Sequence, residues 1–244
     1  MQKNKTNAQM VRTRLFVGAM VATAVVGLTA LGSQSWQERT YQREARRNAE
    51  RTRKTAGLNA AARASEDRHY VSYVELDPEI VAADLDALTD VSAVIIRGFV
   101  KSNRTRVWRK PSGTETINTD YVVQVFDVEK GDWRLAGKNI TVTIPGGYYQ
   151  FPDNTVAEIL TPGFRKPVSE EEYLMFLAPS DRPGTFTLAW GSQSLFALER
   201  NGTVRPTSRE SLPVTEEAKG RDRHEFGSRI RGSVERLRRL GERR

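Results

Sequence analysis

The fold follows from two stretches, SAVIIRGFVKS at residues 92–102 and YVVQVFDV at residues 121–128. Both are rich in β-branched and aromatic residues, and apolar and polar residues alternate along them with the period of two that a half-buried strand requires. Gly98 marks a bulge or bend within the first strand. The same signals predict further short strands at residues 139–144, 173–177, 185–189, 194–199 and 203–205.

These strands belong to one domain, which we place at residues 70–206. A short helix is predicted near its start, where Asp77 is the expected N-cap and Leu85 and Leu88 recur at helical spacing. Strands and helices do not alternate regularly, so the pattern favours a mainly β fold over a parallel α/β fold. We expect a small OB-like antiparallel barrel, closed or partly open, because closure removes the exposed edges of so many short strands.

An uncharged segment precedes this domain. It begins at Leu15 and ends at Leu31, and residues 1–14 before it form a basic flank without an acidic residue. Its length suits a transmembrane helix at residues 15–32 that anchors the chain in the cell membrane; a removed signal segment and a buried soluble helix are the alternatives. The flanking arginines slightly favour a single-pass orientation with the domain outside the cytoplasm.

Two charged segments flank the domain. Residues 33–69 are rich in Arg, Glu, Gln and Ala and lack an apolar seam, which predicts a solvated helical stalk. Residues 207–244 read as a polar linker followed by a basic amphipathic helix with Phe226, Ile230 and Val234 on one face. This tail can dock on the domain, lie on an anionic membrane or fray. In both segments the arginines are also candidates for binding anionic lipids or cell-wall polymers.

The charge and composition of the chain exclude several kinds of catalytic and metal-binding site. The net charge is +8, but residues 70–220 carry 16 basic and 21 acidic residues, so the excess of positive charge belongs to the two ends. The absence of Cys excludes disulfides and thiolate metal sites, and His69 and His224 alone offer little material for a triad or a histidine metal site. We therefore expect no catalytic residue, no cofactor and no metal.

Several motifs of the domain follow one another in a recognisable order. They are VIIRGFV (94–100), TDYVVQV (119–125), ITV with PGG (140–147), EEYLMFL (171–177) and Gly191 with Phe196. In this order they resemble a widespread family of uncharacterised exported bacterial and archaeal domains. The resemblance covers residues 76–204 and implies an OB-like barrel outside the cytoplasm, with no known activity. Two positions depart from the family pattern: Glu170, where glycine is common, and the Ser194-Leu195 pair before Phe196.

Exposed aromatic residues are the candidate ligand contacts. Tyr148, Tyr149 and Phe151 follow a Pro-Gly-Gly turn, and a loop of this kind at a barrel mouth can stack a sugar or peptide ring. The alternative is that these rings only cover one end of the barrel. Trp108 lies in a basic stretch at residues 97–110, a composition that suits single-stranded nucleic acid, although the acidic balance of the domain argues against that partner.

Together these features predict a membrane-anchored, non-enzymatic, extracytoplasmic β-barrel domain that acts as a binding or structural module. Neither the ligand nor a protein partner is defined by the sequence. The alternative is a cytoplasm-facing membrane protein that binds nucleic acid or other polyanions, with strong salt dependence, through its basic stalk and tail. A third interpretation is an enzyme that uses Asp and Glu alone, such as a glycan hydrolase, whose two carboxylates need to lie about 5–10 Å apart in a cleft.

Overall fold

The computed structural model describes residues 51–54, 56–65, 67–74 and 81–242. The chain divides into two compact units, Met1–Arg51 and Thr52–Arg244, and the second unit contains nearly all of the described residues. The predicted anchor from Leu15 to Leu31 lies outside them, as does the predicted stalk up to residue 50. None of the helices that the structure describes combines the length and apolarity needed to cross a membrane.

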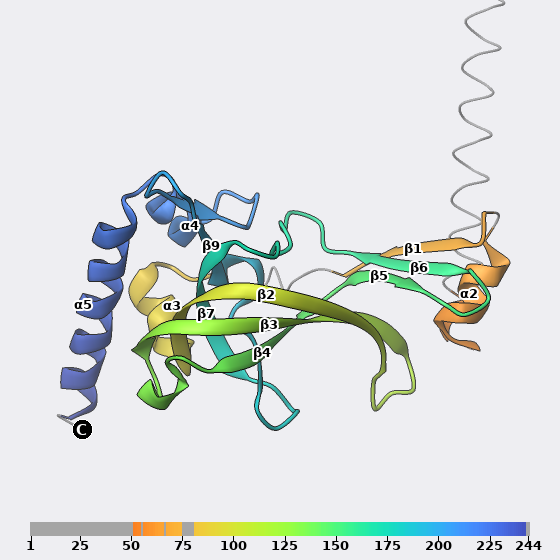
Figure 1. The fold of residues 1–244 in the computed structure, drawn as a ribbon, viewed down its shortest axis with the longest axis horizontal. Helices are drawn as coiled ribbons and strands as arrows, with labels where there is room; N and C mark the ends of the chain where they lie inside the picture. The colour runs from red at the N-terminus through yellow and green to blue at the C-terminus, as the bar shows by residue number, and fades with distance from the viewer. Residues whose placement is uncertain (1–50, 55, 66, 75–80, 243–244) are drawn as a thin grey trace, which may run out of the picture. The chain divides into compact units, whose positions relative to one another are not determined.

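The second unit is mainly β, as the sequence predicts (Figure 1). Its strands are β1 His69–Tyr73, β2 Val94–Arg109, β3 Glu115–Lys130, β4 Asn139–Pro145, β5 Gly147–Gln150, β6 Val156–Leu160, β7 Glu172–Pro179, β8 Thr185–Leu188, β9 Leu195–Leu198 and β10 Val204–Pro206. Its helices are α2 Leu58–Ala64, α3 Leu85–Val91, α4 Pro213–Ala218 and α5 Arg223–Gly241, with short 3-10 turns η1 Trp133–Leu135 and η2 Gly191–Ser194.

Seven strands form one sheet in the order β10-β9-β7-β2-β3-β4-β8. Neighbouring strands run antiparallel, except β4 and β8, which run parallel. β8 also pairs antiparallel with β7, with Leu177 opposite Leu188 and Pro179 opposite Phe186. The pairing thus leads from β7 through β2, β3, β4 and β8 back to β7, and every strand predicted from the sequence is present in this sheet.

β2 and β3 extend further than the sequence predicts. The predicted first strand ends at Ser102, whereas β2 continues to Arg109, and β3 begins at Glu115 rather than near residue 121. The added residues lie opposite one another in the hairpin, for example Arg104 opposite Asp120. Polar residues occupy both faces of this part of the ladder, so the apolar alternation that marks a half-buried strand is missing there.

The predicted irregularity at Gly98 is confirmed. The β2–β3 register shifts between Arg97 and Gly98, and a Cβ atom at Gly98 would lie 2.7 Å from Val123 Cγ1 and 2.8 Å from the Gln124 carbonyl oxygen. After the shift, Tyr121, Val123 and Val125 point into the protein and are at most 3% exposed, while Phe126 is 48% exposed. Tyr121, Val123 and Val125 thus alternate inward as in a regular strand, and Phe126 is the extra residue of the bulge, on the outside.

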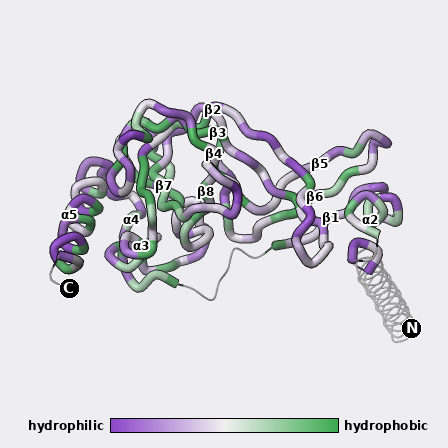
Figure 2. The backbone as a smooth tube through the Cα atoms, turned by 90° about the horizontal axis from the view of Figure 1, so that it is seen from below, coloured by the Kyte–Doolittle hydropathy of each residue, from purple (hydrophilic) through white to green (hydrophobic). Residues whose placement is uncertain are grey.

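Two apolar cores lie on the two sides of the sheet. The first cluster is built from strand residues, among them Ile96, Val123, Val142, Tyr173 and Leu195. The second cluster joins the sheet to the helices, through residues that include Leu88, Ile95, Phe176, Phe196 and Phe226. Figure 2 shows hydrophobic segments along the central strands, whereas α5 alternates between hydrophilic and hydrophobic residues as an amphipathic helix does.

The helix predicted to begin at Asp77 begins later. α3 starts at Leu85, and its N-cap is Asp84, whose carboxylate accepts a hydrogen bond of 2.8 Å from the Ala87 amide. Asp77 lies outside the described residues. At the other end of α3, the Lys130 ammonium donates to the carbonyl oxygens of Thr89 and Asp90, which satisfies part of the helix C-terminus.

The C-terminal tail docks on the domain, which is one of the three outcomes considered for it. Phe226 and Ile230 on α5 are 1% and 0% exposed, whereas Leu240 near its end is 58% exposed. The segment read as a polar linker contains α4, which buries Val214 and Ala218 in the same core. The short length of α4 explains why the sequence pattern did not reveal it.

The end of the predicted stalk is packed rather than solvated. α2 buries Leu58, Ala61 and Ala62 where it contacts β1 and β6, and the Leu58 amide donates to Glu115 Oε2 at 2.8 Å. β1, β6 and β5 form a separate three-stranded sheet, in which β1 and β6 run parallel. The buried face of α2 consists of one leucine and two alanines, and in a segment rich in alanine such a face gives no clear signal of packing in the sequence.

Candidate functional site

The candidate site lies on the exposed face of the long β2–β3 ladder. Arg104, Arg106 and Trp108 alternate along β2 and are exposed, as expected for residues that share one face of a strand. Opposite them on β3 lie Asp120, Asn118 and Thr116, in this order. Trp108 is 42% exposed, so its ring is available from solvent although it is held in the sheet.

Arg182 covers one side of Trp108. It belongs to the loop between β7 and β8, and its guanidinium carbon lies 5.8 Å from the centroid of the Trp108 ring, within the range of a cation–π contact. The guanidinium donates to both carboxylate oxygens of Asp120, at 2.6 and 3.2 Å. This bidentate geometry fixes the guanidinium plane and places the loop beside the ladder.

Asp120 is the centre of the cluster. It is 5% exposed, its carboxylate accepts a hydrogen bond of 2.7 Å from Thr143 Oγ1, and Arg106 approaches it to 3.2 Å. Burial alone acts to raise the pKa of Asp120, but the hydrogen bonds from Arg182 and Thr143 and the charges of both arginines outweigh burial and lower this pKa. Asp120 therefore stays ionised and holds both guanidinium groups in place.

The cluster encloses a pocket of about 120 Å³. The guanidinium groups of Arg106 and Arg182 line it together with the carboxylates of Asp120 and Asp181, so these four charges balance. Arg104, opposite Asp120 on the ladder, adds a positive charge beside the pocket, and the Arg106 side chain is 51% exposed. Guanidinium N–H groups match the planar geometry of a carboxylate or the oxygens of a phosphate. The arrangement can therefore bind an anionic group directly beside an aromatic ring.

A second pocket, of about 500 Å³, lies on the same ladder nearer the bulge. Phe99 and Phe126 form its aromatic wall with ring centroids 6.3 Å apart, and Ala197 and Leu198 also line it. Its rim carries both charges, from Glu170, Glu171, Glu172, Glu199, Arg200, Arg205 and Arg223. This volume lies within the range of about 300–1,000 Å³ typical of small-molecule sites.

The acidic rim does not resemble a pair of catalytic carboxylates. Glu172 is bound by Arg223 at 2.7 Å, and Glu199 by Arg205 at 2.7 Å. The hydrogen bond from Arg205 is the main cause of the lowered pKa of Glu199. An acid catalyst of glycoside hydrolysis needs a raised pKa instead.

The structure separates the four aromatic residues predicted as ligand contacts. Tyr148 and Tyr149 lie on β5 of the small sheet, and Phe151 follows in the next turn. The rings of Tyr149 and Phe151 meet edge to face at 5.0 Å, and Tyr148, which is 52% exposed, lies 6.4 Å from the ring of His69. Trp108 lies on β2 against Arg182 instead, so the structure does not bring the four rings into one cluster.

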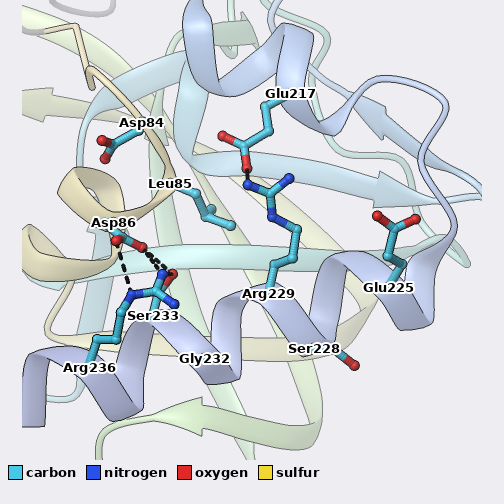
Figure 3. A pocket seen from close by; sticks show the side chains of 10 residues that line it. All are labelled: Asp84, Leu85, Asp86, Glu217, Glu225, Ser228, Arg229, Gly232, Ser233 and Arg236. Atoms are coloured by element: carbon cyan, nitrogen blue, oxygen red, sulfur yellow. Dashed lines mark hydrogen bonds and ion pairs between the residues drawn. The ribbon is translucent and has the colours of Figure 1, made fainter.

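The basic tail uses its arginines within the protein. Arg236 pairs with Asp86 at 2.6 Å and Arg229 with Glu217 at 2.5 Å, across a pocket of about 490 Å³ between α3, α4 and α5 (Figure 3). Ser233 also hydrogen bonds to Asp86 in this pocket. Two further residues of α5 reach strands of the main sheet: Arg223 pairs with Glu172, and Arg231 with Glu129 at 3.2 Å. These pairs explain how a basic helix docks on an acidic domain.

Trp108 stands out in the sequence, but its partners Asp120 and Arg182 do not. Arg182 lies 62 residues from Asp120 along the chain, and only the return of β8 to β4 and β7 brings the two together. Phe99 and Phe126 were not singled out from the sequence as ligand contacts; Phe126 is the extra residue of β3 at the register shift, next to the buried Val125, and is exposed. Within the described part of the chain, no group of three or more His, Asp or Glu residues is placed to hold a metal ion.

Neither a comparison with models of known protein families nor a comparison with curated proteins finds a match for this chain. The evidence for a function therefore comes from the residues on the exposed face of β2 and β3.

Proposed function

We propose that this protein is a membrane-anchored, non-enzymatic binding module that recognises a sugar ligand carrying an acidic group. The observation that supports this most directly is the position of Trp108, half exposed between Arg106 and Arg182. The arginines bind the acidic group, and the indole ring stacks on the neighbouring sugar ring. Asp120 acts as a positioning residue, because it is 5% exposed and its carboxylate holds both arginines.

The domain that presents this site is an OB-like barrel in our proposal. The order of strand pairing supports it, since β8 pairs with both β4 and β7 at the two ends of the run β7-β2-β3-β4. The site then lies on an outer barrel face beside the β2–β3 and β7–β8 loops. OB barrels use the corresponding surface to bind oligosaccharides and oligonucleotides.

The domain faces the outside of the cell in this proposal, held by residues 15–31 as a single-pass anchor. The uncharged run from Leu15 to Leu31 and the resemblance of residues 76–204 to exported domains support this location. Protease treatment of intact cells tests it. Digestion of the domain before lysis is expected, and a domain that is protected until the cells are lysed contradicts this orientation.

A ligand-binding experiment tests the site itself. Linear oligogalacturonates supply carboxylates on sugar rings, and their binding to the full-length protein in detergent can be measured by calorimetry. Trp108→Ala and Arg106→Ala are each expected to weaken binding about tenfold, which corresponds to about 1.4 kcal/mol. Trp133→Ala is the matched control, because Trp133 is 76% exposed on the η1 turn. Equal affinity of all three variants and the wild type contradicts the proposed site.

Polyanion binding through the tail has weaker support. Arg223, Arg229, Arg231 and Arg236 already pair with acidic residues of other elements. A polyanion would have to displace those pairs before it could bind there.

A further inference from the structure

We infer that the ligand is a linear oligosaccharide that occupies both ends of the β2–β3 face, with its acidic end at Trp108 and its uncharged units at Phe99 and Phe126. This inference rests on the proposed function, because it takes the Trp108 cluster as the site of the acidic group. It adds a second subsite, a minimum length and a direction of binding.

The two aromatic ends belong to one continuous ladder. Phe99 lies opposite Gln124 on β3, and the pairing continues from Ser102 to Trp108. The residues of β2 between the two aromatic ends, Lys101 to Val107, are exposed or half exposed, apart from the buried Val100 beside Phe99. Trp108 lies nine positions after Phe99, which corresponds to at most about 30 Å along a strand. A single sugar unit cannot reach from one end to the other, whereas an extended chain of several units can.

The Phe99–Phe126 end suits uncharged sugar rings. Phe126 is 48% exposed, and its ring and that of Phe99 present an apolar surface to a pocket of about 500 Å³. Four glutamates, Glu170, Glu171, Glu172 and Glu199, stand around this surface. Carboxylates only accept hydrogen bonds when ionised, so they suit the hydroxyl donors of a sugar.

The charges of the two ends differ, which gives the ligand a direction. Lys101 and Arg104 lie between the two ends, and neither forms an ion pair with any residue that the structure describes. Near Trp108, three arginines (Arg104, Arg106 and Arg182) outnumber the two aspartates of the pocket, Asp120 and Asp181. The rim of the Phe126 pocket carries four glutamates and three arginines, which leaves one negative charge in excess. A carboxylate is therefore attracted at the Trp108 end and weakly repelled at the Phe126 end.

The same charges decide between two classes of linear polymer. A single-stranded nucleic acid carries one phosphate per nucleotide and would place several phosphates at the Phe126 pocket, where four glutamates outnumber three arginines and the excess negative charge repels them. An oligosaccharide with one acidic end meets no such repulsion. The observations thus favour the oligosaccharide, and binding of oligothymidylate becomes an outcome of the test.

The experiment measures the affinity of full-length protein in detergent for oligogalacturonates of increasing length, both fully acidic and partly methyl-esterified. The affinity of the wild type is expected to rise about tenfold once the oligomer spans both ends. Partly esterified long oligomers are expected to bind more tightly than fully acidic ones of equal length. Oligothymidylate of comparable length is the competing probe.

Two variants separate this inference from the proposed function. Phe126→Ala is expected to abolish the gain of affinity with length and to leave the affinity for short oligomers unchanged, whereas Trp108→Ala lowers the affinity for every length. Both rings are about half exposed, so neither change removes a core contact. Trp133→Ala and Arg209→Ala serve as exposed controls.

The outcomes are distinguishable. If Trp108→Ala weakens binding but affinity does not depend on length or on Phe126, the second subsite is refuted while the proposed function stands. If Trp108→Ala has no effect at any length, the proposed function fails, and this inference fails with it. Tighter binding of oligothymidylate than of any oligogalacturonate, with the same dependence on Trp108 and Phe126, refutes the choice of an oligosaccharide.

Discussion

Replacing Phe226 by alanine tests whether the C-terminal helix is a structural part of the domain. Phe226 is 1% exposed, and its ring meets that of Phe196 edge to face at 5.4 Å, while Phe196 meets Phe176 in the same way at 5.8 Å. Removal of a buried phenyl ring costs about 3–5 kcal/mol, since it loses apolar burial and leaves a cavity. We expect the free energy of unfolding to fall by this amount, a large part of the 5–15 kcal/mol typical of a domain.

Urea denaturation of the full-length protein, followed by circular dichroism, measures this loss. Leu240→Ala is the matched control on the same helix, because Leu240 is 58% exposed and its replacement should change the free energy of unfolding by less than about 0.5 kcal/mol. Hydrogen exchange of the α5 amides adds a local measurement. In the wild type these amides should be protected, and in Phe226→Ala they should exchange faster than the amides of β2 and β3.

A small effect would refute this account of the tail. A loss of less than about 1 kcal/mol for Phe226→Ala, together with unprotected α5 amides in the wild type, would mean that the helix does not pack on the sheet. The second core would then consist of sheet residues together with residues of α3 and α4.

Three further changes test other parts of the structure. Asp120→Asn should lower the free energy of unfolding by about 2 kcal/mol at neutral pH, because charge-assisted hydrogen bonds to Arg182 are lost. The pKa of Asp120 is lowered in the folded protein, so its carboxylate stabilises the fold at pH values above the unfolded pKa of about 3.9. This stabilisation is lost as the pH falls through the folded pKa. The urea midpoints of the wild type and of Asp120→Asn should therefore converge over that pH range. Gly98→Ala should cost about 1–3 kcal/mol in the same assay, since its Cβ atom would lie 2.7 Å from Val123 Cγ1. Gly227→Ala on α5 should raise the thermal midpoint and increase the free energy of unfolding by about 0.5–1 kcal/mol, because alanine favours the helix more than glycine does. A Cβ atom has room there, since its nearest neighbour would be the flexible Arg231 side chain at 3.5 Å. A lower midpoint would contradict the helical geometry at this position.

The strands with a clear apolar alternation could be predicted from the sequence. The stretch at residues 121–128 packs Tyr121, Val123 and Val125 against the first core, so its pattern follows from burial on one face. The stretch at residues 173–177 is buried on both faces, in the first and the second core, and its unbroken apolar run predicts a strand of this kind. β5 follows directly on the Pro-Gly-Gly turn, so its residues were interpreted as a loop. The outer parts of β2 and β3 carry polar residues on both faces, and the pairing of one strand with the other defines them instead.

The tail shows a different limit of sequence analysis. The helical spacing of Phe226 and Ile230 predicted an amphipathic helix, and its surplus of arginine indicated an anionic partner. The partner is the domain itself, through residues such as Asp86 and Glu129 that are distant in sequence. The local sequence pattern gives the charge of the helix surface, but it does not show which other surface that helix contacts.

The candidate site was predictable only in part. Trp108 stood out as an aromatic residue in a basic stretch, which is a local signal. Arg182 and Asp120 carry no local signal, because their roles depend on the pairing of β8 with β4 and β7. Tyr149 and Phe151 contact each other edge to face, and their role as ligand contacts stays a prediction.

The sequence distance across the second core has a consequence for biosynthesis. Leu88 and Ile230 are both fully buried in this core, yet 142 positions separate them along the chain. A ribosome adds about 5–20 residues per second, so Ile230 is synthesised about 7–28 seconds after Leu88. During that interval the face of the sheet that α5 covers is exposed to solvent or to another partner.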